Sequence, residues 1–370
     1  MIKRDIEDKI RAKLGKGKAI VIYGARQVGK TTLLHQIFDD VDNVLWLNGD
    51  LDATQARFEN LSIDSAKLLI GDHTTVIIDE AQRIKNIGLK LKILQDNFGD
   101  KVQFVVTGSS SFELANKINE PMTGRVWIYE LMPFKLSELT NAYGAVKEQG
   151  ALSNRLIYGC YPDVVTHPEN AEEIVTNLSQ ENLYKDVLNL SEIIKTDYLR
   201  KLLKALAFQI GSQVSINELA GLVELDNKTV DKYISLLEQA FVVFRLPSFG
   251  KNLRNELKSS QKIYFYDVGI RNALIEDFRP VESRQDIGGL FENYVISEYK
   301  KQGLKNLYFW RTSQGQEVDL LHEQYGELDA VEIKWNENKT AKMPVTFTGA
   351  YKVADEKYIN RQNYLDQILG

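Results

Sequence analysis

The sequence predicts an α/β protein with a mostly parallel sheet covered by helices on both faces, then a helical region and a small α+β domain. Short apolar runs rich in β-branched residues recur in the first third of the chain, with helical stretches between them, as in βαβ units. These runs cover residues 19–23, 44–47, 75–78 and 103–107. Helical periodicity then dominates, and the chain ends with a helix followed by three strand-like runs.

This order of elements divides the chain into four expected domains. The parallel sheet fills residues 1–135, and a helical lid or linker fills residues 136–197. Residues 198–255 show a helix, a helix-turn-helix and a trailing strand, which is the order of a winged helix. Residues 256–370 form the α+β domain. Within it we expect a strand at 262–266, a helix at 290–302, and strands at 307–311, 318–322 and 330–334.

Composition excludes several classes of protein. The 370 residues include 46 Lys+Arg and 51 Asp+Glu, a formal net charge of -5, which argues against coating nucleic acid through bulk charge. The single cysteine, Cys160, excludes an internal disulfide framework and a Cys-rich zinc site. No run approaches 18 apolar residues, and the acidic N-terminus is unlike a signal peptide. We therefore expect a cytoplasmic protein without a membrane partner.

The strongest motif follows the first apolar run. Residues 24–31, Gly-Ala-Arg-Gln-Val-Gly-Lys-Thr, match G-x-x-x-x-G-K-[ST] between a strand and a helix. The glycines let backbone N–H groups surround phosphate oxygens, Lys30 would reach the β- and γ-phosphates, and Thr31 would ligate Mg²⁺. The predicted fold is thus that of a P-loop NTPase. The expected nucleotide-binding residues are Gly24, Ala25, Arg26, Gln27, Val28, Gly29, Lys30, Thr31 and Thr32.

Two further runs end in polar residues that would lie at the same edge of the sheet. Asp79 and Glu80 follow the run at 75–78, so Asp79 can hold Mg²⁺ through water and Glu80 can activate the attacking water. The alternative is that they are a helix cap and a solvated acid. Thr107 ends the next run and can sense the γ-phosphate or position the water. Arg125 is a candidate arginine finger, in cis or in trans, or a surface ion-pair partner.

These motifs resemble one family over nearly the whole chain. The phosphate loop, the run ending in Asp79 and Glu80, the stretch Thr107-Gly-Ser-Ser and Gly124-Arg125 resemble those of bacterial and archaeal AAA+-type ATPases that carry a C-terminal domain of unknown function 4143. Residues 158–162 (Tyr-Gly-Cys-Tyr-Pro) and 264–270 (Tyr-Phe-Tyr-Asp-Val-Gly-Ile) are similar to further signatures of that family. The resemblance implies ATP as the nucleotide.

Charged residues alternate with apolar ones in the C-terminal strands. Because strand side chains alternate in direction, Glu332 and Lys334 share one face and Asp319 lies on the matching face of the strand before. If these strands pair, Asp319 and Glu332 can hold a divalent metal ion, supported by Lys334 and by Glu292 from the preceding helix. This order resembles the PD-(D/E)XK nucleases, whose fold is restriction-endonuclease-like. The alternative is a half-exposed strand with solvated Glu and Lys.

The winged-helix region has a mild basic excess, with 11 basic and 7 acidic side chains from Lys195 to Lys262. Residues that would contact a nucleic-acid groove and backbone are Asn227, Lys228, Thr229, Lys232 and Tyr233. Winged helices also bind proteins, so both kinds of partner remain open.

The leading hypothesis is a Mg²⁺-dependent ATPase in which nucleotide state repositions the winged helix and the nuclease-like domain, acting on DNA or RNA. An alternative is a nucleotide-gated switch or scaffold whose C-terminal domain binds protein and cleaves nothing. A small-molecule kinase fits less well, because Asp79 and Glu80 suit water activation. An arginine finger in trans would require a homo-oligomer.

Overall fold

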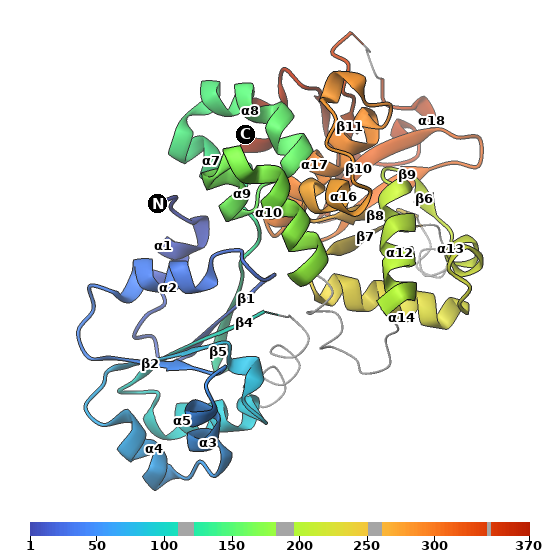
Figure 1. Ribbon diagram of the computed structural model, residues 1–370. Coiled ribbons are helices and arrows are strands. Elements are labelled where there is room, and N and C mark those ends of the chain that lie inside the picture. The colour runs from blue at the N-terminus through green and yellow to red at the C-terminus, as the bar shows by residue number, and fades with distance from the viewer. Residues whose placement is uncertain (110–121, 183–195, 251–260, 339–341) are drawn as a thin grey trace. The chain divides into compact units, whose positions relative to one another are not determined.

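Five parallel strands in the order β2-β3-β4-β1-β5 form the centre of the first part of the chain (Figure 1). The structure is a computed structural model that describes residues 1–109, 122–182, 196–250, 261–338 and 342–370. These residues form two compact units: residues 1–133 with 239–241, and residues 134–238 with 242–370. The expected α/β fold with a parallel sheet is confirmed.

The strands and helices of the first unit alternate along the sequence, as the βαβ pattern predicts. The strands are β1 (Ala19–Tyr23), β2 (Val44–Asn48), β3 (Thr75–Asp79), β4 (Gln103–Gly108) and β5 (Val126–Glu130). The helices are α1 (Asp5–Arg11), α2 (Lys30–Phe38), α3 (Asp52–Glu59), α4 (Ile63–Ile70) and α5 (Ile87–Phe98). Strand β5 is not among the expected runs; its residues are partly buried or exposed because it lies at the edge of the sheet.

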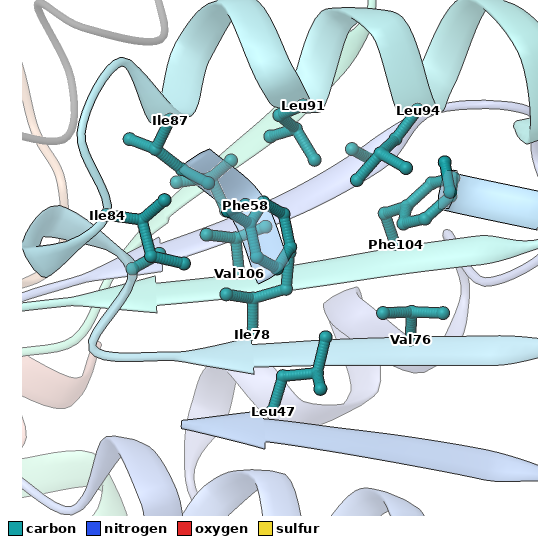
Figure 2. Packing of buried hydrophobic residues seen from close by; sticks show 14 of the residues in the cluster. Leu47, Phe58, Val76, Ile78, Ile84, Ile87, Leu91, Leu94, Phe104 and Val106 are labelled. Atoms are coloured by element: carbon teal, nitrogen blue, oxygen red, sulfur yellow. The ribbon is translucent and has the colours of Figure 1, made fainter. Parts of the chain in front are cut away.

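Apolar side chains on alternate strand positions build the core of this unit. Helices α1 and α2 cover one face of the sheet, and α3, α4 and α5 cover the other (Figure 1). On the second face, Ile87, Leu91 and Leu94 of α5 share one side of the helix because of their i, i+4, i+7 spacing. Figure 2 shows these residues packed against strand residues such as Val106 and Ile78. This packing fixes the sheet whose edge carries the phosphate loop.

The second unit begins with helices, continues with a helix-rich segment and a small sheet, and ends with an α+β layer. Its first helices are α7 (Leu136–Tyr143), α8 (Ala145–Tyr158), α9 (Pro162–Thr166) and α10 (Ala171–Asn177). The next elements are α12 (Thr196–Phe208), β6 (Gln213–Val214), α13 (Ile216–Val223), α14 (Asn227–Gln239), β7 (Val243–Pro247), β8 (Gln261–Phe265) and α16 (Val268–Leu274). Helical periodicity predicts a helix over residues 171–190, of which residues 183–190 lie outside those described.

The segment that contains helices α12, α13 and α14 also contributes the strands of an antiparallel three-stranded sheet of order β6-β8-β7. Strand β8 corresponds to the run at 262–266, which we expected in the C-terminal domain. Its residues instead pair with β7, as Ile263 does with Arg245, and with β6. The expected domain boundary at residue 255 therefore lies between β7 and β8, which are neighbours in one sheet. The four-domain division as a whole stays a prediction.

The last elements form a mixed sheet of order β12-β11-β10-β9. They are α17 (Ile287–Lys301), β9 (Leu307–Arg311), β10 (Glu317–Gln324), β11 (Glu327–Ile333), α18 (Val345–Thr348), β12 (Val353–Ile359) and α19 (Tyr364–Leu369). Neighbouring strands β9, β10 and β11 are antiparallel, whereas β12 is parallel to β11 and follows α18. The expected order of a helix and three strands is confirmed.

A buried aspartate joins two of the family-like signatures. Asp267 caps α16, and its carboxylate accepts hydrogen bonds from the N–H groups of Gly269 (2.9 Å) and Cys160 (2.7 Å). A Cβ at Gly159 would lie 1.9 Å from Asp267 Oδ1, so only glycine fits beside the carboxylate. Residues 158–162 and 264–270 thus make a structural joint inside the second unit.

Candidate functional site

The phosphate loop joins the carboxyl end of β1 to the first turn of α2. Gly29 has φ 90°, a left-handed conformation that glycine adopts readily, and the helix begins at the next residue. A Cβ at Gly24 would lie 1.9 Å from the Leu131 carbonyl oxygen, so the loop passes tightly beside the chain that leaves β5. Ala25 and Val28 are buried, which leaves their backbone as the part that can face a ligand.

The side chain of Lys30 is buried and turns back to the backbone of its own loop. Its Nζ donates hydrogen bonds to the carbonyl oxygens of Gly24 (3.0 Å) and Ala25 (2.9 Å). The ammonium group is therefore held at the loop, where a phosphate would replace these carbonyls as its acceptor. Thr31 and Thr32 lie in the exposed first turn of α2.

Asp79 is fixed between two threonines at the carboxyl edge of the sheet. Its Oδ2 accepts a hydrogen bond from Thr31 Oγ1 at 2.8 Å, and its Oδ1 accepts one from Thr107 Oγ1. Thr107 Oγ1 also accepts the Glu80 N–H at 3.2 Å. A hydroxyl and a carboxylate meeting here are the oxygen donors that Mg²⁺ prefers, so these residues fit the ion. The hydroxyl of Thr107 thus bonds to Asp79 and Glu80 and not to the phosphate loop.

Glu80 has a conformation unusual for a residue with a side chain. Its φ is 50°, in the left-handed region, which costs energy that the surrounding contacts must offset. Its carboxylate accepts a hydrogen bond from Gln82 Nε2, which also donates to Ser109 Oγ at 3.0 Å. The other amide atom of Gln82, Oε1, is buried without a partner. Ser110 of the same stretch lies outside the described residues.

Three residues that position this site were not expected from the sequence: Gln82, Gly49 and Arg4. Gly49 follows β2, donates its N–H to the Asp79 carbonyl (2.7 Å), and has no room for a Cβ, which would lie 2.4 Å from the Glu80 carbonyl oxygen. The buried Arg4 donates to the carbonyl oxygens of Val28 (2.7 Å) and Met132 (2.5 Å). Gly49 and Arg4 give no local signal because their contacts are long-range, whereas Gln82 lies only two residues after the Glu80 that it holds.

Arg125 lies at the opposite edge of the sheet from the phosphate loop. Its carbonyl accepts the N–H of Ala19, the first residue of β1, whereas the loop follows the last residue of that strand. Five strand residues span about 16 Å. Its guanidinium pairs with Asp96 at 2.5 Å. A finger role in cis is therefore wrong, because Arg125 lies beside the first residue of β1 and the phosphate loop follows its last residue. A role in trans stays a prediction.

The C-terminal residues expected to act together do meet in the structure. Lys334 Nζ lies 3.0 Å from Asp319 Oδ2 and 2.6 Å from Glu332 Oε1. The Ile333 N–H donates to Asp319 Oδ2 at 2.8 Å, which locks this carboxylate to β11. Glu292 lies near enough to Asp319 for the two charges to interact.

The structure adds Lys262 and Tyr264 from β8 and Glu317 from β10 to this group. Lys262 Nζ lies 2.9 Å from Glu292 Oε1 and 2.5 Å from Glu317 Oε1, and Tyr264 donates its hydroxyl to Glu292 Oε1 at 2.5 Å. We call this group the carboxylate cluster; it consists of Glu292, Glu317, Asp319, Glu332, Lys262, Tyr264 and Lys334. The β8 residues are not expected in this group from the sequence, because that strand carries no acid and pairs with β6 and β7.

Burial and repulsion between carboxylates shift the protonation of the cluster. Burial, with the neighbouring Asp319, raises the pKa of Glu292 to about 7, although Lys262 opposes the shift. The same two causes raise the pKa of Glu332. Burial lowers the pKa of Lys262, but Glu292 and Glu317 outweigh it and the net shift is upward. Both lysines therefore stay charged.

The cluster fits a metal ion only in part. Glu332 Oε2 is buried without a hydrogen-bond partner among the described residues, which is the kind of oxygen that a cation would satisfy. However, no group of three His, Cys, Asp or Glu residues within the described ranges is arranged to hold a metal ion. The expected pair of Asp319 and Glu332 is brought together, and its use as a metal site stays a prediction.

The expected groove-facing residues of α14 are only partly available. Lys228 and Lys232 are exposed. Thr229 donates its hydroxyl to Asp226 at 2.6 Å, and Asn227 donates its amide to Asn217. Tyr233 is 5% exposed, so it belongs to the core and cannot reach a groove. The sequence alone does not show that position 233 lies on the buried face of this helix.

No helix among the described residues has the length and apolarity needed to cross a membrane.

Three family models match successive parts of the chain. Residues 16–140 match an AAA domain, residues 149–280 a domain of unknown function (DUF8612), and residues 287–366 a domain of unknown function (DUF4143). The second match begins in the helical region and ends beyond β8, so it spans the expected boundary at residue 255.

Similar curated proteins are uncharacterized ones from bacteria and an archaeon. A Mycobacterium tuberculosis protein is 27% identical over 338 residues, covering 90% of this chain and 74% of that protein. A Methanocaldococcus jannaschii protein is 25% identical over 372 residues, covering 92% of this chain and 79% of that protein.

Among solved structures, a Walker-type ATPase of Pyrococcus abyssi has a TM-score of 0.49 and 14% identity, covering 74% of this chain and 96% of that chain. The family matches agree with the parallel sheet, the phosphate loop and the C-terminal mixed sheet described above. This chain therefore carries an AAA-like P-loop ATPase domain followed by a C-terminal domain of unknown function 4143.

Proposed function

We propose that the chain binds ATP with Mg²⁺ and hydrolyses it at the phosphate loop. The observation that carries the proposal is the contact of Thr31 with Asp79 at 2.8 Å, with Glu80 at the same edge of the sheet. These are the two oxygen donors and the carboxylate that phosphoryl transfer to water requires.

Each residue has a distinct task in this reaction. The loop N–H groups and Lys30 hold the phosphates, and Thr31 and Asp79 hold Mg²⁺, which neutralises phosphate charge. Glu80 orients the attacking water and accepts its proton. Gln82 and Thr107 are positioning residues: Gln82 holds the Glu80 carboxylate, and Thr107 holds Asp79 and the Glu80 N–H.

We further infer that nucleotide state controls the second unit. The segment 131–136 connects the units, and its two ends are anchored differently. Leu131 donates its N–H to Tyr23 beside the loop (2.8 Å), and Arg4 ties Met132 to Val28. Phe134 donates to the Cys160 carbonyl (2.9 Å) inside the second unit. A shift of the loop would therefore pull on a segment that continues into the other unit.

The second unit would act on DNA or RNA through the helices and small sheet around α14, which we interpret as a winged helix, and through the carboxylate cluster as a nuclease-like site. Exposed Lys228 and Lys232 on α14 support contact with phosphates. The second candidate is a nucleotide-gated switch with an inactive C-terminal domain. The ion pairs of Lys262 and Lys334 favour it, because they occupy carboxylates that cleavage would need for a metal ion.

The test is steady-state ATP hydrolysis with and without single- and double-stranded DNA and RNA, at low and moderate salt, because phosphate contacts weaken with salt. Lys30→Ala should abolish hydrolysis, and Lys67→Ala, an exposed lysine on α4, is the matched control. Wild-type rates in Lys30→Ala would disprove the site assignment. Stimulation by one nucleic acid would support the coupled function, and slow turnover indifferent to all of them would favour the switch.

A further inference from the structure

Lys262 is a buried cation that contacts two acidic side chains, Glu292 and Glu317, and lies near a third, Asp319. Only 1% of its side chain is exposed, although lysine is almost never fully buried unless it is paired. It lies on β8, while its partners Glu292 and Glu317 lie on α17 and β10. One lysine thus bridges carboxylates from two different elements, at N–O distances of 2.9 and 2.5 Å.

The two lysines divide the carboxylate cluster between them. Lys262 contacts Glu292 and Glu317, whereas Lys334 contacts Asp319 and Glu332. The remaining oxygen of Glu317 pairs with Arg311 at 3.1 Å. On the Lys262 side, Glu292 Oε1 and both oxygens of Glu317 are therefore already bound to ammonium, guanidinium or the Tyr264 hydroxyl. On the Lys334 side, Glu332 Oε2 has no partner in the described part of the chain.

We propose that Lys262 is a tethered cation that takes the place of a divalent metal ion between Glu292 and Glu317, and so confines metal binding to the weaker Asp319–Glu332 side. Affinity for hard divalent cations rises with the number of charged oxygen ligands. Removing the ammonium would free Glu292, whose charge interacts with that of Asp319, and would remove a positive charge that repels a metal ion. The proposal concerns the second unit alone and does not depend on ATP hydrolysis.

The experiment measures Mn²⁺ binding to the full chain without nucleotide, by electron paramagnetic resonance titration and by the shift in melting temperature. Lys262→Met keeps the length of the side chain and removes its charge. Its dissociation constant for Mn²⁺ should fall by about tenfold or more relative to the wild type. Its melting temperature should be lower without Mn²⁺, because buried carboxylates lose their partner, and Mn²⁺ should restore it.

The matched control is Lys352→Met, which removes an exposed lysine that pairs with Glu327 away from the cluster. It should bind Mn²⁺ as the wild type does. Adding Glu332→Gln to Lys262→Met should abolish the gain, which would distinguish the cluster from the phosphate loop. A merely structural Lys262 would give a variant that is destabilised equally with and without Mn²⁺, and that result would overturn the proposal.

If Lys262→Met does not fold in either condition, the charge-balanced variant Lys262→Met/Glu317→Gln decides the question. It removes one charge of each sign and leaves Glu292 near Asp319 without the repelling ammonium. Tighter Mn²⁺ binding than in the wild type would support the tethered cation. Unchanged affinity, or wild-type protein that already binds Mn²⁺ as tightly, would refute it.

Discussion

Glu80 combines two properties that rarely occur together in one residue. Its backbone is left-handed, and its carboxylate is held by Gln82, which is itself fixed by Ser109. Backbone strain of this kind persists only where surrounding contacts over-determine it, and it gathers at functional sites. The sequence motif identified the acid, but not the amide that aims it.

Glu80→Gln should therefore separate binding from turnover. The amide keeps the size of the side chain but cannot accept a proton from water, so hydrolysis should fall by about a hundredfold or more. ATP affinity, measured by equilibrium binding of a fluorescent analogue, should change by less than about threefold. Equal loss of affinity and turnover would contradict its role as the base.

Glu292 should make stability depend on pH. Its pKa is about 7 in the folded chain, against 4.5 as the ordinary value, because of burial and Asp319. The folded state therefore binds more protons than the unfolded state between these values. Stability should fall as pH rises from 4.5 through 7, by about 3 kcal/mol at most.

Urea unfolding at pH 5 and pH 8 measures this difference for the wild type, for Glu292→Gln and for the exposed Glu169→Gln as control. Glu292→Gln should lose clearly less stability between the two pH values than either of the others. A slope that is the same in all three proteins would show that Glu292 is not the titrating group.

At the scale of elements, the close approach of neighbouring chain segments shapes the nucleotide site. Gly49, after β2, lies against the Glu80 backbone, and Gly24 lies against Leu131 after β5. Neither contact follows from local sequence. The first depends on β2 and β3 being neighbours in register, and the second on β5 lying beside β1.

Gly49→Ala should disturb the Asp79–Glu80 turn. Its Cβ would lie 2.4 Å from the Glu80 carbonyl oxygen, a backbone atom that cannot rotate away. We expect a loss of about 1–3 kcal/mol in unfolding free energy, as in other overpacked sites, together with slower hydrolysis. Chemical unfolding and ATPase assays measure the two effects.

The control is Gly221→Ala on α13, where a Cβ would meet nothing within 4 Å. Alanine favours helices over glycine by about 1 kcal/mol, so this variant should be neutral or more stable. Normal stability and turnover in Gly49→Ala would show that the turn relaxes around the added methyl group.

Sequence reasoning succeeded where a motif and a strand period acted together. The phosphate loop, Asp79 and Glu80 meet as expected because the carboxyl ends of parallel strands share an edge. Asp319, Glu332 and Lys334 meet because alternation places them on matching faces. It failed for the cis finger role of Arg125, because a glycine–arginine pair does not show whether it precedes or follows the neighbouring strand. It missed Lys262 because β8 pairs with β6 and β7, which both precede it in the sequence, and not with a strand of the C-terminal sheet.

For the whole molecule, the segment 131–136 is a covalent route by which nucleotide could affect the second unit. Arg4 links Val28 in the phosphate loop to Met132 in that segment, through two carbonyl oxygens. One guanidinium is therefore hydrogen-bonded to both the loop and the segment. Coupling requires an element that both sites bias, and we propose that the segment is that element.

A non-hydrolysable ATP analogue with Mg²⁺ should therefore slow amide hydrogen exchange in residues 24–31 and also in residues 131–136. Arg4→Met removes both hydrogen bonds while keeping apolar bulk, so the loop should still be protected while the protection of 131–136 falls several-fold. Arg11→Met, whose guanidinium bonds to carbonyls of α2 instead, is the matched control and should behave as the wild type does. Equal protection of both segments in Arg4→Met would show that nucleotide reaches the connecting segment without this arginine, through the packing of Gly24 on Leu131.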